Sequence, residues 1–233
     1  MRVVLTRPQE DSERSAAVLR ARGHEVLIAP LMKIETVTTE LSTNWGAIII
    51  TSANAATAVA THPARDELIK LPLYAVGRRS ADAARMAGFS DVTAAGGDLD
   101  DLLRLVNARR PDATAPVLYL AGEDRSGDLI GDLAVHGIAA ELAVVYRAVT
   151  VPFPPALVAA LTEGAVDAVL HFSRRSADNY LAGAKKAGIE QQALKVRHFC
   201  LSAQVSEPLV KANAGNIAVA RRPDEASLIA LIG

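Results

Sequence analysis

The sequence predicts an α/β protein of two flavodoxin-like parallel-sheet domains, one inserted in the other and joined by a two-segment linker. Three observations predict it. Short apolar segments alternate with helical ones along the chain, the chain repeats itself internally, and the repeat is interrupted. A length of 233 residues, half of them hydrophobic, suits two small domains with good cores.

The apolar segments are short, rich in β-branched residues and mostly not alternating with polar residues. That pattern is typical of strands buried on both faces of a parallel sheet. The ten predicted strands are Val3–Leu5, Val26–Ile28, Ala47–Ile50, Leu73–Val76, Asp91–Ala94, Val117–Leu120, Leu142–Val145, Ala168–Phe172, His198–Leu201 and Ile217–Ala220.

Amphipathic stretches lie between most of these strands. The stretch 15–22 ends at Gly23, and Gly88 and Gly137 end similar stretches, as expected of glycine at the carboxyl end of a helix. Alternating strands and helices favour βαβ units with right-handed crossovers, and hence parallel sheets.

The internal repeat divides the predicted strands into two sets. Residues 45–60 are similar to 166–182, residues 73–106 to 197–231, and residues 3–34 to 117–146. In the last pair the aligned residues are Val3 with Val117, Ser12 with Ser126, Leu19 with Leu133, and Gly23 with Gly137. Self-similarity over such a length indicates two domains of similar architecture.

The order of the repeated segments predicts the domain boundaries. Residues 1–36 plus 151–233 form an outer domain, residues 40–148 an inserted domain, and residues 37–39 and 149–150 the hinge linkers. Pro152, Pro154 and Pro155 favour an extended second crossing. Five-stranded parallel sheets of this kind bind ligands beyond the carboxyl ends of their strands, and a cleft between two domains is a common ligand site.

Composition argues against several classes of function. A net charge of −1 gives no global attraction to nucleic acid or membrane. The single cysteine, Cys200, favours a reducing cytoplasm, and the start of the chain lacks the pattern of a signal peptide. The five histidines lack metal-binding spacing, and neither a P-loop nor a GxGxxG motif occurs. We therefore expect no metal and no cofactor, and by default a monomer.

Arginines and small polar residues gather in the turns after the predicted strands. Candidate ligand-binding residues there are Arg7, Ser52, Asn54, Gly77, Ser80, Gly122, Arg125, Ser173, Arg174, Ser202 and Gln204. Helix amino termini in such turns offer free N–H groups, and arginine suits carboxylate or phosphate, so the pattern predicts a site for an anion. Asp124 and Asp128 are interpreted as charges at a helix start. His171 and Cys200 lie inside predicted strands and are interpreted as core residues.

Several of these segments resemble the uroporphyrinogen-III synthase family. The similar segments are VVLTRP at 3–8, PLMKIE at 30–35, IIITSANA at 48–55, YAVG at 74–77, LAGEDR at 120–125, VVYRAV at 144–149 and HFSRRSA at 171–177. They follow the family's order and span nearly the whole chain. The resemblance implies two flavodoxin-like domains joined by a two-stranded linker, and a cofactor-free cyclisation of hydroxymethylbilane, which carries eight carboxylates, to uroporphyrinogen III.

The resemblance also implies roles for particular residues. Tyr146 matches a family tyrosine thought to face the cleft, where it could donate a hydrogen bond to the departing hydroxyl; packing in the linker strand is the equal alternative. Ser80 matches a Thr or Ser of the cleft, and Ser52 and Ser173 lie in equivalent turns. The segment 202–205 departs from the family pattern, because no hydroxyl stands at its last position. Contacts there would come from Ser202, Gln204 or backbone.

Two other functions stay open on the sequence alone. A two-lobed protein that binds a small anion without catalysis would share the lobes, although such a sensor usually carries a DNA-binding or partner segment, and none is evident. A transferase acting on a nucleotide or sugar could also have two α/β lobes.

Overall fold

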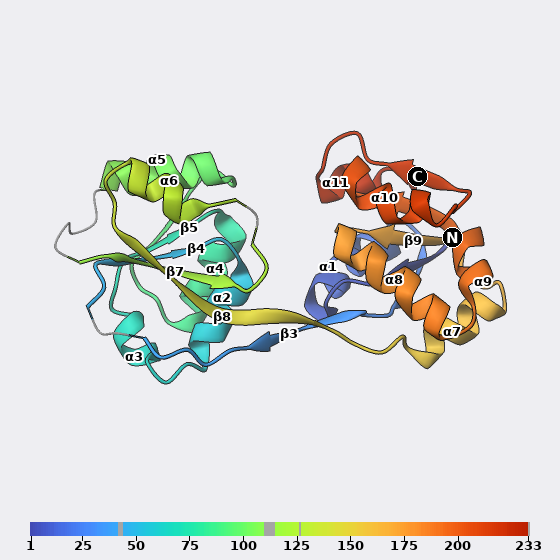
Figure 1. Cartoon of the computed structure of the whole chain (residues 1–233), viewed down its shortest axis with the longest axis horizontal. Helices are drawn as coiled ribbons and strands as arrows, with labels where there is room; N and C mark the ends of the chain where they lie inside the picture. The colour runs from blue at the N-terminus through green and yellow to red at the C-terminus, as the bar shows by residue number, and fades with distance from the viewer. Residues whose placement is uncertain (42–43, 110–114, 126, 233) are drawn as a thin grey trace. The chain divides into compact units, whose positions relative to one another are not determined.

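The computed structural model describes residues 1–41, 44–109, 115–125 and 127–232, so Ser126 of the internal repeat lies outside it. The chain divides into two compact units (Figure 1). Unit 1 comprises Met1–Lys33 and Val149–Gly233, and unit 2 comprises Ile34–Ala148. Each unit is a sheet of mainly parallel strands flanked by helices, which confirms the predicted α/β fold. None of the described helices is long and apolar enough to cross a membrane.

Unit 1 contains a five-stranded sheet in the order β11-β10-β9-β1-β2, with every neighbouring pair parallel. Its strands are β1 (Arg2–Leu5), β2 (Glu25–Ile28), β9 (Ala168–His171), β10 (Arg197–Cys200) and β11 (Ile217–Val219). Its helices are α1 (Gln9–Ala21), α7 (Pro155–Thr162), α8 (Arg174–Lys186), α9 (Glu190–Lys195), α10 (Ala203–Lys211) and α11 (Glu225–Ile229).

Both faces of this sheet are covered. Successive side chains of a strand point to opposite faces, so Val3 and Leu5 pack with α1 and α11, whereas Val4 packs with α7, α8 and α9. Burial on both faces explains why β1 is a continuous apolar run rather than an alternating one.

Unit 2 contains a six-stranded sheet in the order β3-β8-β7-β4-β5-β6. Its strands are β3 (Met32–Thr36), β4 (Ala47–Ile50), β5 (Leu73–Ala75), β6 (Val92–Ala94), β7 (Val117–Gly122) and β8 (Ala140–Thr150). Its helices are α2 (Ala53–Ala60), α3 (Arg65–Leu68), α4 (Arg78–Ala87), α5 (Leu99–Arg109) and α6 (Leu129–Val135). Helices α5 and α6 cover one face of the sheet and α2, α3 and α4 the other (Figure 1).

The two strand orders agree with the internal repeat. Apart from β3, the order β8-β7-β4-β5-β6 matches β2-β1-β9-β10-β11 strand for strand. Thus β7 and β8 are the counterparts of β1 and β2, and β4 to β6 are the counterparts of β9 to β11. The same spatial arrangement is reached by two permuted chain orders, as the interrupted repeat predicts.

The structure differs from the sequence prediction at the segments that connect the units. An eleventh strand, β3, was not among the ten predicted from apolar runs, and β8 is far longer than the predicted 142–145. The backbone N–H of Val37 donates to the carbonyl of Val145 at 2.8 Å, and Arg147 pairs with Glu35 at 3.2 Å. Pro155 begins α7 instead of belonging to an extended linker, because proline suits the first turn of a helix. The hinge at 37–39 and 149–150 stays a prediction.

Glycine ends helices where the sequence predicted it. Gly23, Gly88 and Gly137 have φ values of 83°, 109° and 74° and follow α1, α4 and α6. This left-handed conformation carries little cost for glycine, and it turns the chain from a helix towards the next strand.

Candidate functional site

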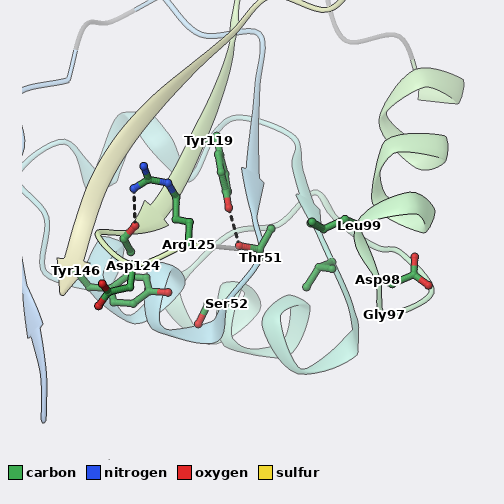
Figure 2. Close-up of a pocket in the computed structure, with 11 residues that line it drawn as sticks. Thr51, Ser52, Gly97, Asp98, Leu99, Tyr119, Asp124, Arg125 and Tyr146 are labelled. Atoms are coloured by element: carbon green, nitrogen blue, oxygen red, sulfur yellow. Dashed lines mark hydrogen bonds between the residues drawn. The ribbon is translucent and has the colours of Figure 1, made fainter. Parts of the chain in front are cut away.

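A pocket of about 420 Å³ lies at the carboxyl ends of the unit 2 strands (Figure 2). It is lined by Thr51, Ser52, Val76, Gly97, Asp98, Leu99, Tyr119, Gly122, Asp124, Arg125 and Tyr146. All of these residues belong to unit 2. They come from five strands or the turns that follow them, so the pocket occupies the edge at which parallel sheets bind ligands.

The pocket opens where the chain leaves two adjacent strands in opposite directions. After β4 the chain enters α2 on one face, and after the neighbouring β7 it enters α6 on the other. This divergence is the topological switch point of the sheet, and it leaves a crevice between the two turns. Thr51 and Ser52 line one side of it and Gly122 to Arg125 the other. Ser52 caps α2 by accepting a hydrogen bond from the N–H of Asn54 at 3.2 Å.

Gly122 makes room for the ring of Tyr146. The two residues are partners in the β7–β8 ladder, and the N–H of Glu123 donates to the carbonyl of Tyr146 at 3.0 Å. A Cβ atom on Gly122 would lie 2.6 Å from two ring carbons of Tyr146, closer than van der Waals contact allows. Only glycine at position 122 therefore lets the phenol ring lie across the end of β7 and into the pocket.

Burial raises the pKa of the Tyr146 phenol above its ordinary value of 10.0, and the hydrogen bond with Ser52 opposes that shift. The nearby Tyr119 and the charge of Asp124 raise this pKa further. A phenol whose pKa is raised stays protonated at neutral pH. Tyr146 is thus a hydrogen-bond donor held by β8 against a pocket.

The pocket offers hydroxyl groups, one guanidinium and two carboxylates. The hydroxyls of Thr51 and Tyr119 are hydrogen-bonded to each other at 2.9 Å (Figure 2). Tyr119 belongs to β7 and is buried, with only 6% of its surface exposed. Arg125 folds back so that its guanidinium donates to the carbonyls of Gly122 and Glu123, both at 3.0 Å. This arrangement can present neutral donors and one cation to a polar ligand.

The family model of uroporphyrinogen-III synthase HemD matches residues 13–230. The chain belongs to the uroporphyrinogen-III synthase family. No match was found among curated protein sequences. The structure of the uroporphyrinogen-III synthetase from Helicobacter pylori 26695 is similar in fold, with a TM-score of 0.67 and 19% identity over 100% of this chain and 98% of that one. A uroporphyrinogen III synthase from the extremely thermophilic bacterium Thermus thermophilus aligns with a TM-score of 0.43 and 19% identity over 100% and 95%.

Four of the residues predicted from the sequence meet in the pocket of this uroporphyrinogen-III synthase family member. They are Ser52, Gly122, Arg125 and Tyr146. Gly77 lies just behind it, because a Cβ atom there would be 3.4 Å from the Cα of Gly97.

Two further predicted residues lie in helix starts near the pocket without lining it. Ser80 is buried in the first turn of α4, with 5% of its surface exposed. Asn54 is half-buried in the first turn of α2 and contributes its backbone N–H to the Ser52 cap. A role for either side chain in binding the family's substrate stays a prediction.

The other predicted residues lie at the corresponding strand ends of unit 1. Arg7 is engaged by two carboxylates, Glu225 at 3.3 Å and Asp11 at 3.8 Å, and its guanidinium stacks 4.1 Å from the centre of the Phe172 ring. An anionic ligand would have to compete with these carboxylates for Arg7.

The remaining predicted residues of unit 1 lie at the starts of α8 and α10. Ser173 forms a capping box with Ser176 at the start of α8. Arg174 pairs with Glu207 at 3.1 Å. Ser202 is the N-cap residue of α10, and Gln204 is exposed in its first turn. These residues and Arg7 stay predicted ligand contacts.

The sequence did not indicate the whole pocket, and one residue lies elsewhere than predicted. The pocket residues it did not single out are Thr51, Val76, Gly97, Asp98, Leu99 and Tyr119. The interpretation of Asp124 as a helix-start charge was wrong, because α6 begins at Leu129 and Asp128 caps it, accepting from the N–H of Gly131 at 3.0 Å. The missed signal was positional: nearly all of these residues stand at or just after the end of a strand.

Proposed function

We propose that this chain is a cyclising hydro-lyase that converts hydroxymethylbilane to uroporphyrinogen III, with loss of water and inversion of ring D. The observation that carries the proposal is the family match, which extends over residues 13–230. The reaction needs no cofactor, because the bilane supplies all the atoms and electrons of the product.

The chemistry begins at the hydroxymethyl end of the bilane. Its carbon–oxygen bond breaks, the electron pair leaves with the oxygen, and the oxygen takes up a proton and departs as water. The nitrogen lone pair of the terminal pyrrole supplies the missing electrons, so that this ring becomes a cationic azafulvene. Ring D then attacks the exposed carbon with the ring carbon that already carries the bridge to ring C, which gives a spiro intermediate. The bond from that ring carbon to the bridge breaks, and the bridge carbon becomes part of a second azafulvene on ring C. The other α carbon of ring D attacks the bridge carbon, and loss of its proton restores the aromaticity of ring D and returns the proton consumed in the first step.

The unit 2 pocket suits the first of these steps. Tyr146 is a protonated donor within a pocket, and such a group can protonate or hydrogen-bond a departing hydroxyl. Ser52 and Arg125 would hold the polar substituents of the same ring, since guanidinium and hydroxyl groups suit carboxylates.

The strand-end residues of unit 1 would bind other carboxylates of the substrate. We assign this role to Arg7, Ser173, Arg174, Ser202 and Gln204, together with the backbone N–H groups at the starts of α8 and α10. In unit 2 we assign it also to Asn54, Gly77 and Ser80. Holding several carboxylates at once would fold the bilane so that its two ends meet, which is catalysis by proximity.

We further propose that the enzyme works as a monomer in the cytoplasm, without nucleic acid or membrane partners. A net charge of −1 and a single cysteine, Cys200, support this setting.

The decisive experiment supplies freshly prepared hydroxymethylbilane to the purified protein and separates the product isomers. We expect uroporphyrinogen III to predominate, whereas a heat-denatured control should give the type I isomer that forms when the bilane closes without inversion. Saturable binding of the bilane with only type I product would contradict the proposal and favour the anion-binding alternative.

Replacing Tyr146 with phenylalanine should lower kcat for the type III isomer by about ten- to a hundredfold, with KM nearly unchanged. This loss lies at or below the lower end of the roughly 10²- to 10⁴-fold range for general acids, because the hydroxyl also leaves without the enzyme. Steady-state kinetics with isomer separation measures both constants, and an unchanged kcat would restrict Tyr146 to the packing role that the sequence left open.

Gly122→Ala should lower kcat to a similar extent, because the added Cβ atom must displace the Tyr146 ring. The matched test is the double variant Gly122→Ala/Tyr146→Ala, compared with Tyr146→Ala alone. With the ring removed, the alanine at 122 has nothing to displace, so the two should have the same kcat. A further loss in the double variant would show that Gly122 acts by some other route.

A further inference from the structure

The charges of the unit 2 pocket are poorly suited to holding carboxylates alone. Among its described lining residues are two carboxylates, Asp98 and Asp124, and one guanidinium, Arg125. Carboxylates repel the acidic side chains of a polycarboxylate substrate. A pocket that only anchored such a substrate would gain from a neutral residue at either position, so each aspartate needs another explanation.

Asp98 has a structural one. Its carboxylate accepts a hydrogen bond from the N–H of Asp101 at 2.8 Å, at the start of α5. An aspartate in that position caps the helix, and the positive end of the helix dipole partly offsets its charge. The carboxylate of Asp98 is therefore used by the fold.

Asp124 does not cap a helix. It precedes α6 by several residues, and that helix is capped by Asp128 instead. The turn that carries Asp124 is nonetheless fixed on both sides. The Arg125 guanidinium binds the carbonyls of Gly122 and Glu123, and the N–H of Glu123 binds the carbonyl of Tyr146.

Asp124 and Tyr146 lie together at one end of the pocket (Figure 2). The carboxylate is near enough for its charge to disfavour ionisation of the phenol. The site thus places a protonated donor and a negative charge side by side. Both groups favour departure of the hydroxyl from the hydroxymethyl carbon, because that step consumes a proton at the oxygen and creates a positive charge on the pyrrole ring.

We propose that Asp124 is a catalytic residue whose carboxylate stabilises the cationic azafulvene formed when the hydroxyl departs. The inference rests on the proposed function, and it specifies which part of the substrate the pocket takes: the hydroxymethyl-bearing ring. Arg125 binds a carboxylate of that same ring, Tyr146 faces the departing oxygen, and Asp124 faces the ring that becomes positive. The carboxylate forms no bond to the substrate, so the balance of atoms and protons is that of the reaction given above.

The proposal predicts that loss of the Asp124 charge lowers kcat without raising KM. Asp124→Asn keeps the shape of the side chain and removes its charge. It should lower kcat for the type III isomer by about a hundredfold, the scale of losing one preorganised electrostatic group. KM should stay the same or fall, because a negative charge near the substrate carboxylates has been removed. A residue that merely supports the turn would instead raise KM or lower the melting temperature.

Asp128→Asn is the matched control. It removes the same charge four residues along, outside the pocket lining, and asparagine caps a helix as well as aspartate does. Its kcat and KM should equal those of the unaltered protein. Asp124→Glu restores the charge one methylene further out, and its kcat should lie between those of Asp124→Asn and the unaltered protein.

A bilane with a methyl group in place of the hydroxymethyl group tests the same point without catalysis. It cannot form the cation, so its Kd for Asp124→Asn should be equal to or lower than its Kd for the unaltered protein. Calorimetric titration of both proteins measures this.

Three outcomes would overturn the inference while the unaltered protein makes type III product. They are an unchanged kcat in Asp124→Asn, a kcat for Asp124→Glu no higher than that for Asp124→Asn, and a weaker Kd for the methyl analogue in Asp124→Asn. If Asp124→Asn fails to fold, the test rests on Asp124→Glu alone. The proposal then requires that this variant still makes type III product, with a kcat below that of the unaltered protein. Failure of the proposed function itself looks different, because the unaltered protein would then give only the type I isomer.

Discussion

Acidification from pH 6.5 to about pH 4 is expected to destabilise unit 1 by on the order of 3 kcal/mol through His198 alone. His198 and His171 are both fully buried on adjacent strands, with Nε2 of His171 3.1 Å from Nδ1 of His198. Burial lowers the pKa of His198 from 6.5 to about 4. Burial, and then the neighbouring His198, also lowers the pKa of His171 well below 6.5.

The sign of the effect follows from proton binding. Between pH 6.5 and 4 the unfolded chain takes up protons on these histidines, whereas the folded protein keeps them neutral. The free energy of unfolding therefore rises with pH across this window. The contribution is fully present above pH 6.5 and is lost progressively as the pH falls towards the folded pKa.

Urea unfolding followed by circular dichroism between pH 7.5 and 4 measures the effect. The matched variant is His171→Gln/His198→Asn, whose amides can keep a hydrogen bond between the two side chains but cannot titrate. In this variant the free energy of unfolding should depend on pH much less steeply, and the remaining dependence should come from the carboxylates. Equal slopes in the double variant and the unaltered protein would contradict the prediction.

Tyr180→Ala should cost about 3–5 kcal/mol of unfolding free energy, the range for removing a large buried ring. Tyr180 is fully buried, and its hydroxyl donates to the carbonyl of Ala193 at 3.1 Å. Its ring packs against Phe153, His171 and His198, with centroid distances of 5.4 to 5.8 Å. Tyr180→Phe keeps the ring and loses only the hydrogen bond, so its cost should be about 1 kcal/mol.

The chain supplies one spectroscopic or chemical probe for each unit. Its single cysteine, Cys200, is buried in unit 1, and its single tryptophan, Trp45, lies in unit 2. Burial raises the pKa of the Cys200 thiol to about 12, so the folded unit should resist thiol reagents.

In Tyr180→Ala, labelling of Cys200 should accelerate in proportion to the lost stability, and Trp45 fluorescence under native conditions should not change. Slow labelling indistinguishable from that of Tyr180→Phe would contradict the assigned cost.

Local sequence sufficed for the elements whose burial is uniform. A strand such as β4 is buried on both faces, so an apolar run alone predicts it, and a helix such as α1 ends where glycine permits a left-handed residue. The same reasoning missed β3, because MKIET mixes charged and apolar residues and is a strand only by virtue of its pairing with β8. The turn at 122–125 was likewise only half predicted. Arginine and glycine stood out as residue types, whereas Asp124 looked like an ordinary helix-start charge.

The sequence by itself determined the fold class, the interrupted repeat, the family, and the edge of the sheet at which the candidate ligand-binding residues gather. These follow from patterns that can be read along the chain without knowing which segments are in contact: the hydrophobic period, the positions of glycine and the internal repeat. Only the tertiary structure decided which side chains share the pocket. Tyr119 reaches it from inside a strand, Tyr146 enters because Gly122 lacks a Cβ atom, and Asp124 stands beside a phenol more than twenty residues away. Such neighbours depend on strand register and on divergent connections at the switch point, and no local pattern encodes either.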